Sequence, residues 1–445
     1  MKDSQKNIKN TIYFMGIVFI YKLTLEIGFW DILQKSYAGL GVYKFEFNFV
    51  KYIIGILWCT ILAILIDYNR KKPSTFFVQM LYIVAIIPMT VIFAFSNENT
   101  MYFNCVCIAF AICEMIVLFF KNIYLPEIDI MTKILILGFF FITFVVYIDM
   151  IAENGMPSLA ALNIYDVYQI RSNFHLNKYV GYLFEWQYTI ITPFFIIRAY
   201  YRKKYITGFC FCFLQFLSYL YAAQKTILFI IPLVLALCII SRMKNFALYT
   251  YMTLVGGVFL ITCGSGISEI VYRIYDLFVR RVLLLPANLK FIYYDFFSQN
   301  PKIGLAGTLW GKFLDIPHPY EERIGIIISK VYFNKPEMNS NTGFLAEGYY
   351  RFGIIGIFIV LILFAFILLC LDYFANSNGY AFAVTMGFFS IFLLNDGGLI
   401  DPLIFGHLTV LVLLCVFYNQ KNDFKIQNKR IKVRRKHERT IIEQN

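Results

Sequence analysis

Long, unbroken apolar runs limit what this chain can fold into. The first covers residues 12–30, and further runs of similar length follow it along the sequence. About 20 consecutive apolar residues in a helix match the ~30 Å hydrocarbon core of a bilayer. Strands of a membrane β-barrel alternate apolar and polar residues instead, so the pattern disfavours a barrel. The hydrophobic share of 60% and charged share of 15% exclude a soluble globular domain and a disordered chain.

Twelve such segments predict an all-α polytopic integral membrane protein. Spans of ~20 residues account for ~240 residues in twelve helices, which leaves roughly 200 for loops. We expect residues 1–418 to form a single transmembrane domain. The predicted spans share apolar composition and near-membrane length: 12–30, 49–66, 75–95, 101–120, 132–150, 186–199, 206–222, 226–241, 246–264, 350–371, 380–395 and 402–418.

The distribution of lysine and arginine predicts the orientation of the chain. If the amino terminus is cytoplasmic and sides alternate, the inner segments carry 23 of these residues and the short outer segments five. Because basic residues are retained on the cytoplasmic side, both termini are predicted to be cytoplasmic. The basic tail, 419–445, would then face anionic lipid headgroups. The net charge of +13 therefore needs no nucleic-acid partner.

Two predicted outer segments are much longer than the rest, at 151–185 and 265–349. Functional residues concentrate on loops held by a rigid scaffold, so these segments point to binding or chemistry at the outer face. Each is expected to contain a helix lying in the membrane interface. The sequences concerned are SLAALNIYDVYQIR and YRIYDLFVRRVLLLPANLKFIYYDFF.

The first outer segment and a neighbouring turn carry candidate anion-binding residues. Arg171, His175 and Lys178 are spaced i, i+4 and i+7, so they would share one face if the helix continues. Such a face suits an anionic partner, although contact with lipid phosphate is an equal interpretation. Lys225 lies in a tight outer turn, against the general charge trend, where it either binds a ligand or reaches toward the interface.

The second outer segment opens with Arg280 and Arg281. Arginine suits a diphosphate because its planar guanidinium offers several donors in a fixed fork. The sequence contains no Gly-rich phosphate loop, no Asp-x-Asp pair and no metal-ligand cluster, and its ten cysteines are unaccompanied by histidine. No metal, cofactor or nucleotide-sugar donor is therefore predicted.

Several local strings resemble the bacterial O-antigen and capsule repeat-unit polymerases. They are the arginine–glycine pair from Arg171 to Gly181, the turn-helix AAQKTILFIIPL, the opening RRVLLLP and the string NTGFLAEGYYRFGIIG. The related O-antigen ligases carry a histidine–asparagine pair before the last string, where this chain has Ser340 and Asn341. The resemblance therefore favours a polymerase over a ligase.

The resemblance implies a glycosyltransferase in the bacterial inner membrane with its active face outside the cytoplasm. Undecaprenyl-diphosphate-linked repeat units would be its substrates, and a chain-length regulator and a flippase would be its partners. A diphosphate would leave and a sugar hydroxyl would attack, so cations and a proton acceptor are required. The expected catalytic residues are Glu347, His318, Arg280 and Arg171. The expected substrate-binding residues are Lys225, Arg281, Asn341 and His175.

Three alternatives stay open at this stage. Glu347 and His318 compete as the proton acceptor, and Glu347 could instead pair with Arg351 at i+4. A ligase-like transferase would share the architecture. A flippase or permease for lipid-linked sugars would also need outer cations, but it predicts repeats around a central cavity rather than a long outer loop. The sugar, the linkage and the stereochemistry are not set by these residues.

Overall fold

The described part of this computed structural model is helical. It comprises residues 2–37, 43–66, 70–120, 129–163, 166–243 and 245–419, and no strand forms within these ranges. The prediction of a helical membrane protein is confirmed by helices long and apolar enough to cross a bilayer. Seven such helices lie in the described ranges: Thr11–Tyr37, Pro73–Phe95, Thr100–Phe119, Met131–Asn154, Tyr205–Ala222, Phe246–Gly264 and Phe344–Asn378. From residue 420 on, the predicted basic tail lies outside the described residues.

The chain divides into two compact units, each formed from separate stretches of sequence. The first unit comprises Met1–Lys121, Arg242–Leu369 and Ser390–Phe405. The second unit comprises Asn122–Ser241, Cys370–Phe389 and Gly406–Asn445. The two are described separately below, and the first outer segment belongs to the second unit.

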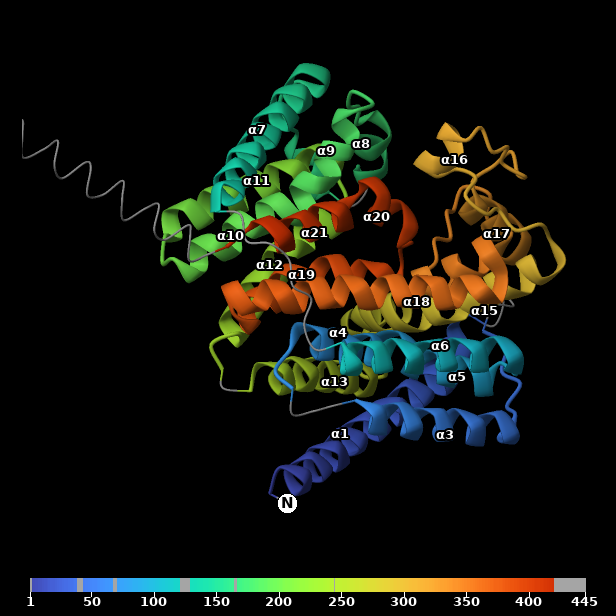
Figure 1. The fold of residues 1–445 in the computed structure, drawn as a ribbon. Coiled ribbons are helices and arrows are strands. Elements are labelled where there is room, and N and C mark those ends of the chain that lie inside the picture. The colour runs from blue at the N-terminus through green and yellow to red at the C-terminus, as the bar shows by residue number, and fades with distance from the viewer. Residues whose placement is uncertain are drawn as a thin grey trace, which may run out of the picture. The chain divides into compact units, whose positions relative to one another are not determined.

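The first unit is built around a buried helix formed by α4, η3 and α5. The most apolar part of this helix is entirely buried, as expected for a helix that is hydrophobic on every face. Helix α5 packs against α1, α3, α6 and α15, and Figure 1 shows α3, α5 and α6 side by side. The elements of this unit are α1 (Lys2–Ile27), η1 (Gly28–Leu33), α2 (Gln34–Tyr37), α3 (Phe49–Leu65), α4 (Pro73–Leu81), η3 (Tyr82–Ile86), α5 (Ile87–Phe95), α6 (Thr100–Phe119), α13 (Phe246–Gly264), α14 (Glu269–Tyr275), η6 (Asp276–Leu284), α15 (Leu285–Gln299), α16 (Leu309–Phe313), α17 (Ile324–Phe333), most of α18 (Phe344–Asn378), η7 (Leu393–Asn395) and α20 (Ile400–Phe405).

The second unit contains the remaining helices, connected by short turns. Helices α10 and α11 pack together, and α11 packs against α12. Ala223 ends α11 in the left-handed conformation, with φ 49°, which allows the chain to reverse directly into α12. The elements of this unit are α7 (Asp129–Asn154), η4 (Leu159–Leu162), α8 (Val167–Asn173), α9 (Val180–Trp186), η5 (Gln187–Ile191), α10 (Thr192–Tyr201), α11 (Tyr205–Ala222), α12 (Lys225–Ile240), the end of α18, α19 (Tyr380–Phe392) and α21 (His407–Phe417).

Helix α18 has a sharp kink at Gly353. This residue has φ +70° and ψ −152°, a conformation that L residues rarely adopt. The backbones on the two sides of the kink also approach closely, since a Cβ on Gly356 would lie 1.9 Å from the carbonyl oxygen of Gly348. The kink therefore separates the main part of the predicted span 350–371 from the first turns of α18.

The second outer segment differs from the predicted surface helix. Residues 286–293 of α15 are all buried inside the first unit, so the expectation that this helix lies on the surface is wrong there. Most side chains of this stretch are apolar or aromatic, which favours burial, and the two polar ones, Asn288 and Lys290, are buried with them. The segment also has an exposed apolar helix, α16, where Leu309, Trp310 and Phe313 are 53%, 53% and 79% exposed.

Candidate functional site

The carboxylate of Glu347 is buried, and both of its oxygens accept hydrogen bonds. Its Oε1 accepts a hydrogen bond from Nε of Arg351 at 2.9 Å, and only 1% of the residue is exposed. Its Oε2 accepts the backbone N–H groups of Ile400, at 3.1 Å, and Leu399. A Cβ on Gly398 would lie 2.8 Å from the carboxylate, so a glycine is needed for this approach. The ion pair, one of the two interpretations of Glu347, is thus present.

Arg351 joins the first turns of α18 to two other parts of the first unit. Its Nη1 donates to the carbonyl oxygens of Gly304, at 3.1 Å, and Ala306, at 3.3 Å. Its Nη2 donates to Oδ2 of Asp401 at 3.2 Å. Both the carboxylate of Glu347 and the guanidinium are therefore neutralised inside the protein, which makes the pair a structural link.

Lys290 is a buried lysine that the sequence reasoning did not select. It lies in α15 with 1% of its surface exposed, and its Nζ donates to Oδ1 of Asn395 at 3.1 Å and to the carbonyl of Pro286 at 3.2 Å. Burial lowers the pKa of Lys290 to about 7, although Asp396 acts in the opposite direction. The signal that could have identified it is a single cation within the apolar run LLLPANLKFIYY.

Asp396 and Arg281 lie near this lysine. Burial raises the pKa of Asp396 to about 6, and the charges of Lys290 and Arg281 oppose that rise. Arg281 itself is exposed, so it could meet an anion from outside. The low pKa of Lys290 and the high pKa of Asp396 have the same cause, because burial outweighs the attraction between the two charges.

Arg280 is engaged with residues of its own unit. Its Nη2 donates to Oδ2 of Asp276 at 3.0 Å, and its guanidinium lies 4.6 Å from the centre of the Tyr37 ring. The hydroxyl of Tyr37 donates to the same carboxylate. Arg280 thus forms part of an ion pair with an aromatic cover, and a bound diphosphate would have to compete with Asp276.

His318 and Asn341 are both exposed. Nδ1 of His318 lies 2.7 Å from the carbonyl oxygen of Tyr320 and 3.2 Å from its backbone nitrogen, so the ring is bonded within its own turn. The structure thus does not connect His318 to Glu347, and within the described residues neither is placed as a ready proton acceptor.

In the second unit, Arg171 is brought next to the turn that carries Lys225. Nη2 of Arg171 donates to the carbonyl oxygen of Ala223 at 2.9 Å. Ala223 lies two residues before Lys225, which begins α12 and is exposed. Arg171 and Ala223 are 52 residues apart in sequence, so the first outer segment and the α11–α12 turn share one surface.

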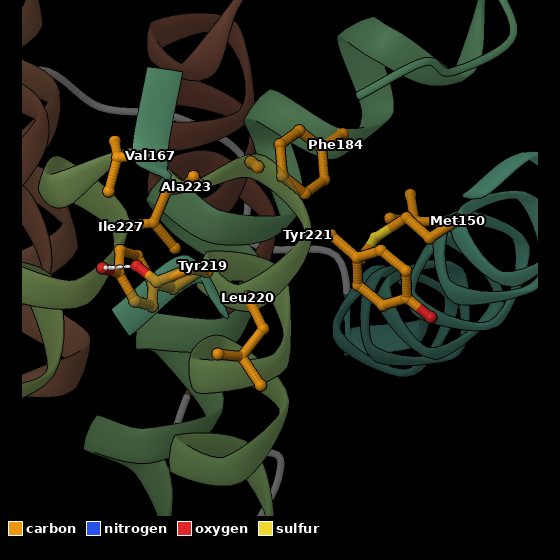
Figure 2. Packing of buried hydrophobic residues seen from close by; sticks show 11 residues of the cluster. Met150, Val167, Phe184, Tyr219, Leu220, Tyr221, Ala223 and Ile227 are labelled. Atoms are coloured by element: carbon orange, nitrogen blue, oxygen red, sulfur yellow. Dashed lines mark hydrogen bonds between the residues drawn. The ribbon is translucent and has the colours of Figure 1, made fainter. Parts of the chain in front are cut away.

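An apolar cluster holds this surface together. Figure 2 shows Val167, Phe184 and Tyr219 packed around the α11–α12 turn. The hydroxyl of Tyr219 donates to the carbonyl of Ala161 at 2.8 Å, which is the dashed line in the figure. The hydroxyl of Tyr221 donates to the carbonyl of Gly155, also at 2.8 Å. These contacts fix the first outer segment on a rigid base.

The prediction that Arg171, His175 and Lys178 share a helix face is wrong. Helix α8 ends at Asn173, so His175 and Lys178 lie beyond its last turn. The side chain of Asn154 explains this, because its amide accepts the N–H of His175 at 3.0 Å and donates to its carbonyl at 2.7 Å. These bonds satisfy the His175 backbone outside a helix.

Sequence reasoning also missed a histidine–carboxylate pair in the second unit. Nδ1 of His407 lies 2.9 Å from Oε1 of Glu185, and His407 is 5% exposed. Nε2 of His407 is buried, and it has no hydrogen-bond partner among the described residues. The available signals were a lone histidine in an apolar segment and a glutamate just before another, with nothing to connect them.

Comparisons with family models, curated proteins and solved structures found no match. No group of three or more His, Cys, Asp or Glu side chains in the described ranges could hold a metal ion.

The two units therefore offer different chemistry. In the first, Glu347, Arg351 and Arg280 are neutralised by partners, and Arg281 remains an exposed cation. In the second, Arg171 and Lys225 are gathered on one surface. Because both side chains are exposed, an anion could reach that surface from outside, so the second unit is the better candidate site.

Proposed function

We propose that this protein joins lipid-diphosphate-linked oligosaccharide repeat units into a surface polysaccharide, of the O-antigen or capsule type. The observation that carries the proposal is the surface where Arg171 holds the turn of Lys225. Two cations on a rigid base outside the apolar core suit the negative charge of a diphosphate. Undecaprenyl diphosphate is the leaving group that the family resemblance implies, and a chain-length regulator and a flippase are the partners that it implies.

The proposal includes twelve membrane spans with both termini in the cytoplasm of a bacterium. Besides the seven long helices, four shorter apolar helices coincide with predicted spans: Phe49–Leu65, Lys225–Ile240, Tyr380–Asn395 and His407–Phe417. The continuous run of α9, η5 and α10 covers the remaining predicted span, 186–199. In this topology the surface of Arg171 and Lys225 faces away from the cytoplasm of the inner membrane.

In the proposed reaction, the diphosphate leaves the anomeric carbon of the growing chain and a sugar hydroxyl of a new repeat unit replaces it. Lys225 would meet the departing diphosphate directly. Arg171, which is held at the turn by its hydrogen bond to Ala223, would add a second positive charge beside the phosphate oxygens. Charge that develops on the leaving group is then stabilised by groups already in place, which lowers the barrier.

A strain that lacks the gene tests this proposal when it is complemented with single variants. Lys225→Ala and Arg171→Ala are the test variants, and Lys178→Ala is the matched control because it removes an exposed cation of the same outer segment. Membrane abundance of each variant is measured by immunoblot. We expect the test variants to convert the polysaccharide ladder on a gel into single repeat units, and the control to keep the ladder.

The same gel separates polymerisation from transport. Single repeat units on the surface mean that units cross the membrane without being joined, which supports a polymerase. Complete loss of surface sugar, with lipid-linked units accumulating inside the cell, would mean that the protein is a flippase. A full ladder in both test variants at normal abundance would overturn the role of this surface.

A further inference from the structure

The imidazole of His407 uses only one of its two nitrogens. Nδ1 lies 2.9 Å from Oε1 of Glu185, while Nε2 is buried with no partner in the described structure. An ionised carboxylate can only accept a hydrogen bond, so with Glu185 ionised the proton of this contact is on Nδ1. In the neutral ring Nε2 then keeps its lone pair and can accept a proton.

Glu185 has a second effect beyond setting the tautomer. A carboxylate beside the ring stabilises the positive charge that forms when Nε2 takes a proton. The side chain of Glu185 is 35% exposed while that of His407 is 6% exposed, so the acid is partly accessible and the ring is not. The pair therefore combines a shielded proton acceptor with a partly exposed counter-charge.

The pair belongs to the same part of the second unit as the cation surface. Phe184, next to Glu185 on α9, packs in one cluster with Ala223 and Ile227 of the α11–α12 turn (Figure 2). Ala223 is also the residue whose carbonyl binds Arg171. Helix α21, which begins at His407, packs against α9. The acceptor and the cations are thus built on connected elements of one unit.

The other two candidates for the proton acceptor are less suitable. Glu347 already accepts bonds from Arg351 and from two backbone N–H groups. The ring of His318 is exposed and bonded within its own turn. His407 alone among these three combines burial with a nitrogen that has no partner in the described residues.

We propose that Nε2 of His407 takes the proton of the attacking sugar hydroxyl, with Glu185 as its positioning residue. This inference rests on the proposed function. The hydroxyl oxygen forms a bond to the anomeric carbon as its proton passes to Nε2. The bond from that carbon to the diphosphate oxygen breaks, and its electron pair leaves with the diphosphate toward Lys225 and Arg171. Because Nε2 is buried, the side chains that cover it must move for the acceptor sugar to reach it.

The test uses the full-length protein in nanodiscs with lipid-linked repeat units purified from the gene-deletion strain. The initial rate of polymerisation is measured for the wild type, His407→Ala and Glu185→Gln. Loss of a general base lowers rates by about 10²–10⁴-fold, so His407→Ala is expected to fall in that range. Glu185→Gln should lower kcat and leave KM within about twofold, because substrate binding does not use this carboxylate.

Chemical rescue distinguishes a proton acceptor from a packing residue. Added imidazole should restore part of the rate of His407→Ala, whereas 1,2,4-triazole, of the same shape but much less basic, should not. Equal rescue by both would show that the side chain only fills space and would overturn the inference. If His407→Ala fails to fold, an unchanged kcat in Glu185→Gln overturns it instead.

Failure of the proposed function has a different outcome. If the wild-type protein does not join purified repeat units at all, the proposed function falls and the inference falls with it. If the wild type is active and His407→Ala keeps more than half its rate, only the assignment of the proton acceptor falls.

Discussion

The buried ion pair of Glu347 and Arg351 makes a quantitative prediction about stability. Its side chains are 2% and 4% exposed, and each has further partners inside the first unit. Removing one member of a buried pair leaves an uncompensated charge, which costs about 3–5 kcal/mol. Arg351→Met should therefore lower the free energy of unfolding by about 3–5 kcal/mol.

Glu347→Gln should cost less than Arg351→Met. Glutamine keeps an oxygen for the N–H groups of Leu399 and Ile400, and Arg351 keeps Asp401 and two carbonyls. What is lost is one hydrogen bond between charged groups, about 1.5–3 kcal/mol. The double variant removes both charges. Its cost should therefore be about 2 kcal/mol less than the sum of the two single costs.

The assay is unfolding in mixed micelles, monitored by circular dichroism at a fixed protein-to-detergent ratio. A coupling of about 2 kcal/mol corresponds to about a 30-fold change in the unfolding equilibrium. Asp401→Asn is the matched control, since its side chain is 55% exposed and exposed pairs contribute about 0–1 kcal/mol. Additive costs, within about 0.5 kcal/mol, would show that Glu347 and Arg351 are not coupled and would refute the reasoning.

Three further predictions concern other parts of the fold. Gly398→Ala should lower the thermal midpoint without loss of expression, because its Cβ would lie 2.8 Å from the Glu347 carboxylate; an unchanged midpoint would mean that the carboxylate can move aside. Burial lowers the pKa of Lys290 from 10.5 to about 7, so between these pH values the unfolded chain binds more protons than the folded one. The free energy of unfolding should therefore rise as the pH increases from about 7 to 10.5, and Lys290→Met should flatten that rise. Tyr221→Phe removes a 2.8 Å bond to the first outer segment and should speed hydrogen exchange there, whereas Tyr179→Phe, at a 77% exposed position, should not.

Periodicity and composition predict the helices of this chain well, because both are local properties. The apolar segments around 75–95 and 101–120 are recovered as long helices with bounds within two residues at each end. The location of the segment 285–297 was harder to predict, because an apolar helix outside the predicted spans can lie on a membrane or inside the protein. We predicted a helix on the surface, whereas the structure buries residues 286–293 inside the first unit.

The string NTGFLAEGYYRFGIIG shows how much structure a short motif can hold. Its glycines permit the positive φ at Gly353 and the close contact of Gly348 with Gly356. Its two charged residues, Glu347 and Arg351, form a buried ion pair. The spacing i, i+4 predicted that pair. It did not predict Asp401 or the N–H groups of Leu399, because these lie about 50 residues further along the chain.

Partners that are distant in sequence determine what each candidate residue can do. Arg171 and Lys225 were predicted from their charge, their place in outer segments and the family resemblance, yet only the fold shows that one binds the turn of the other. His407 and Glu185 are 222 residues apart, and neither stands out without its partner. In a chain with few charges, a buried polar group must find a partner or remain unsatisfied at a cost. Nε2 of His407 carries that cost in the described structure, which is the physical reason to expect that it serves a ligand.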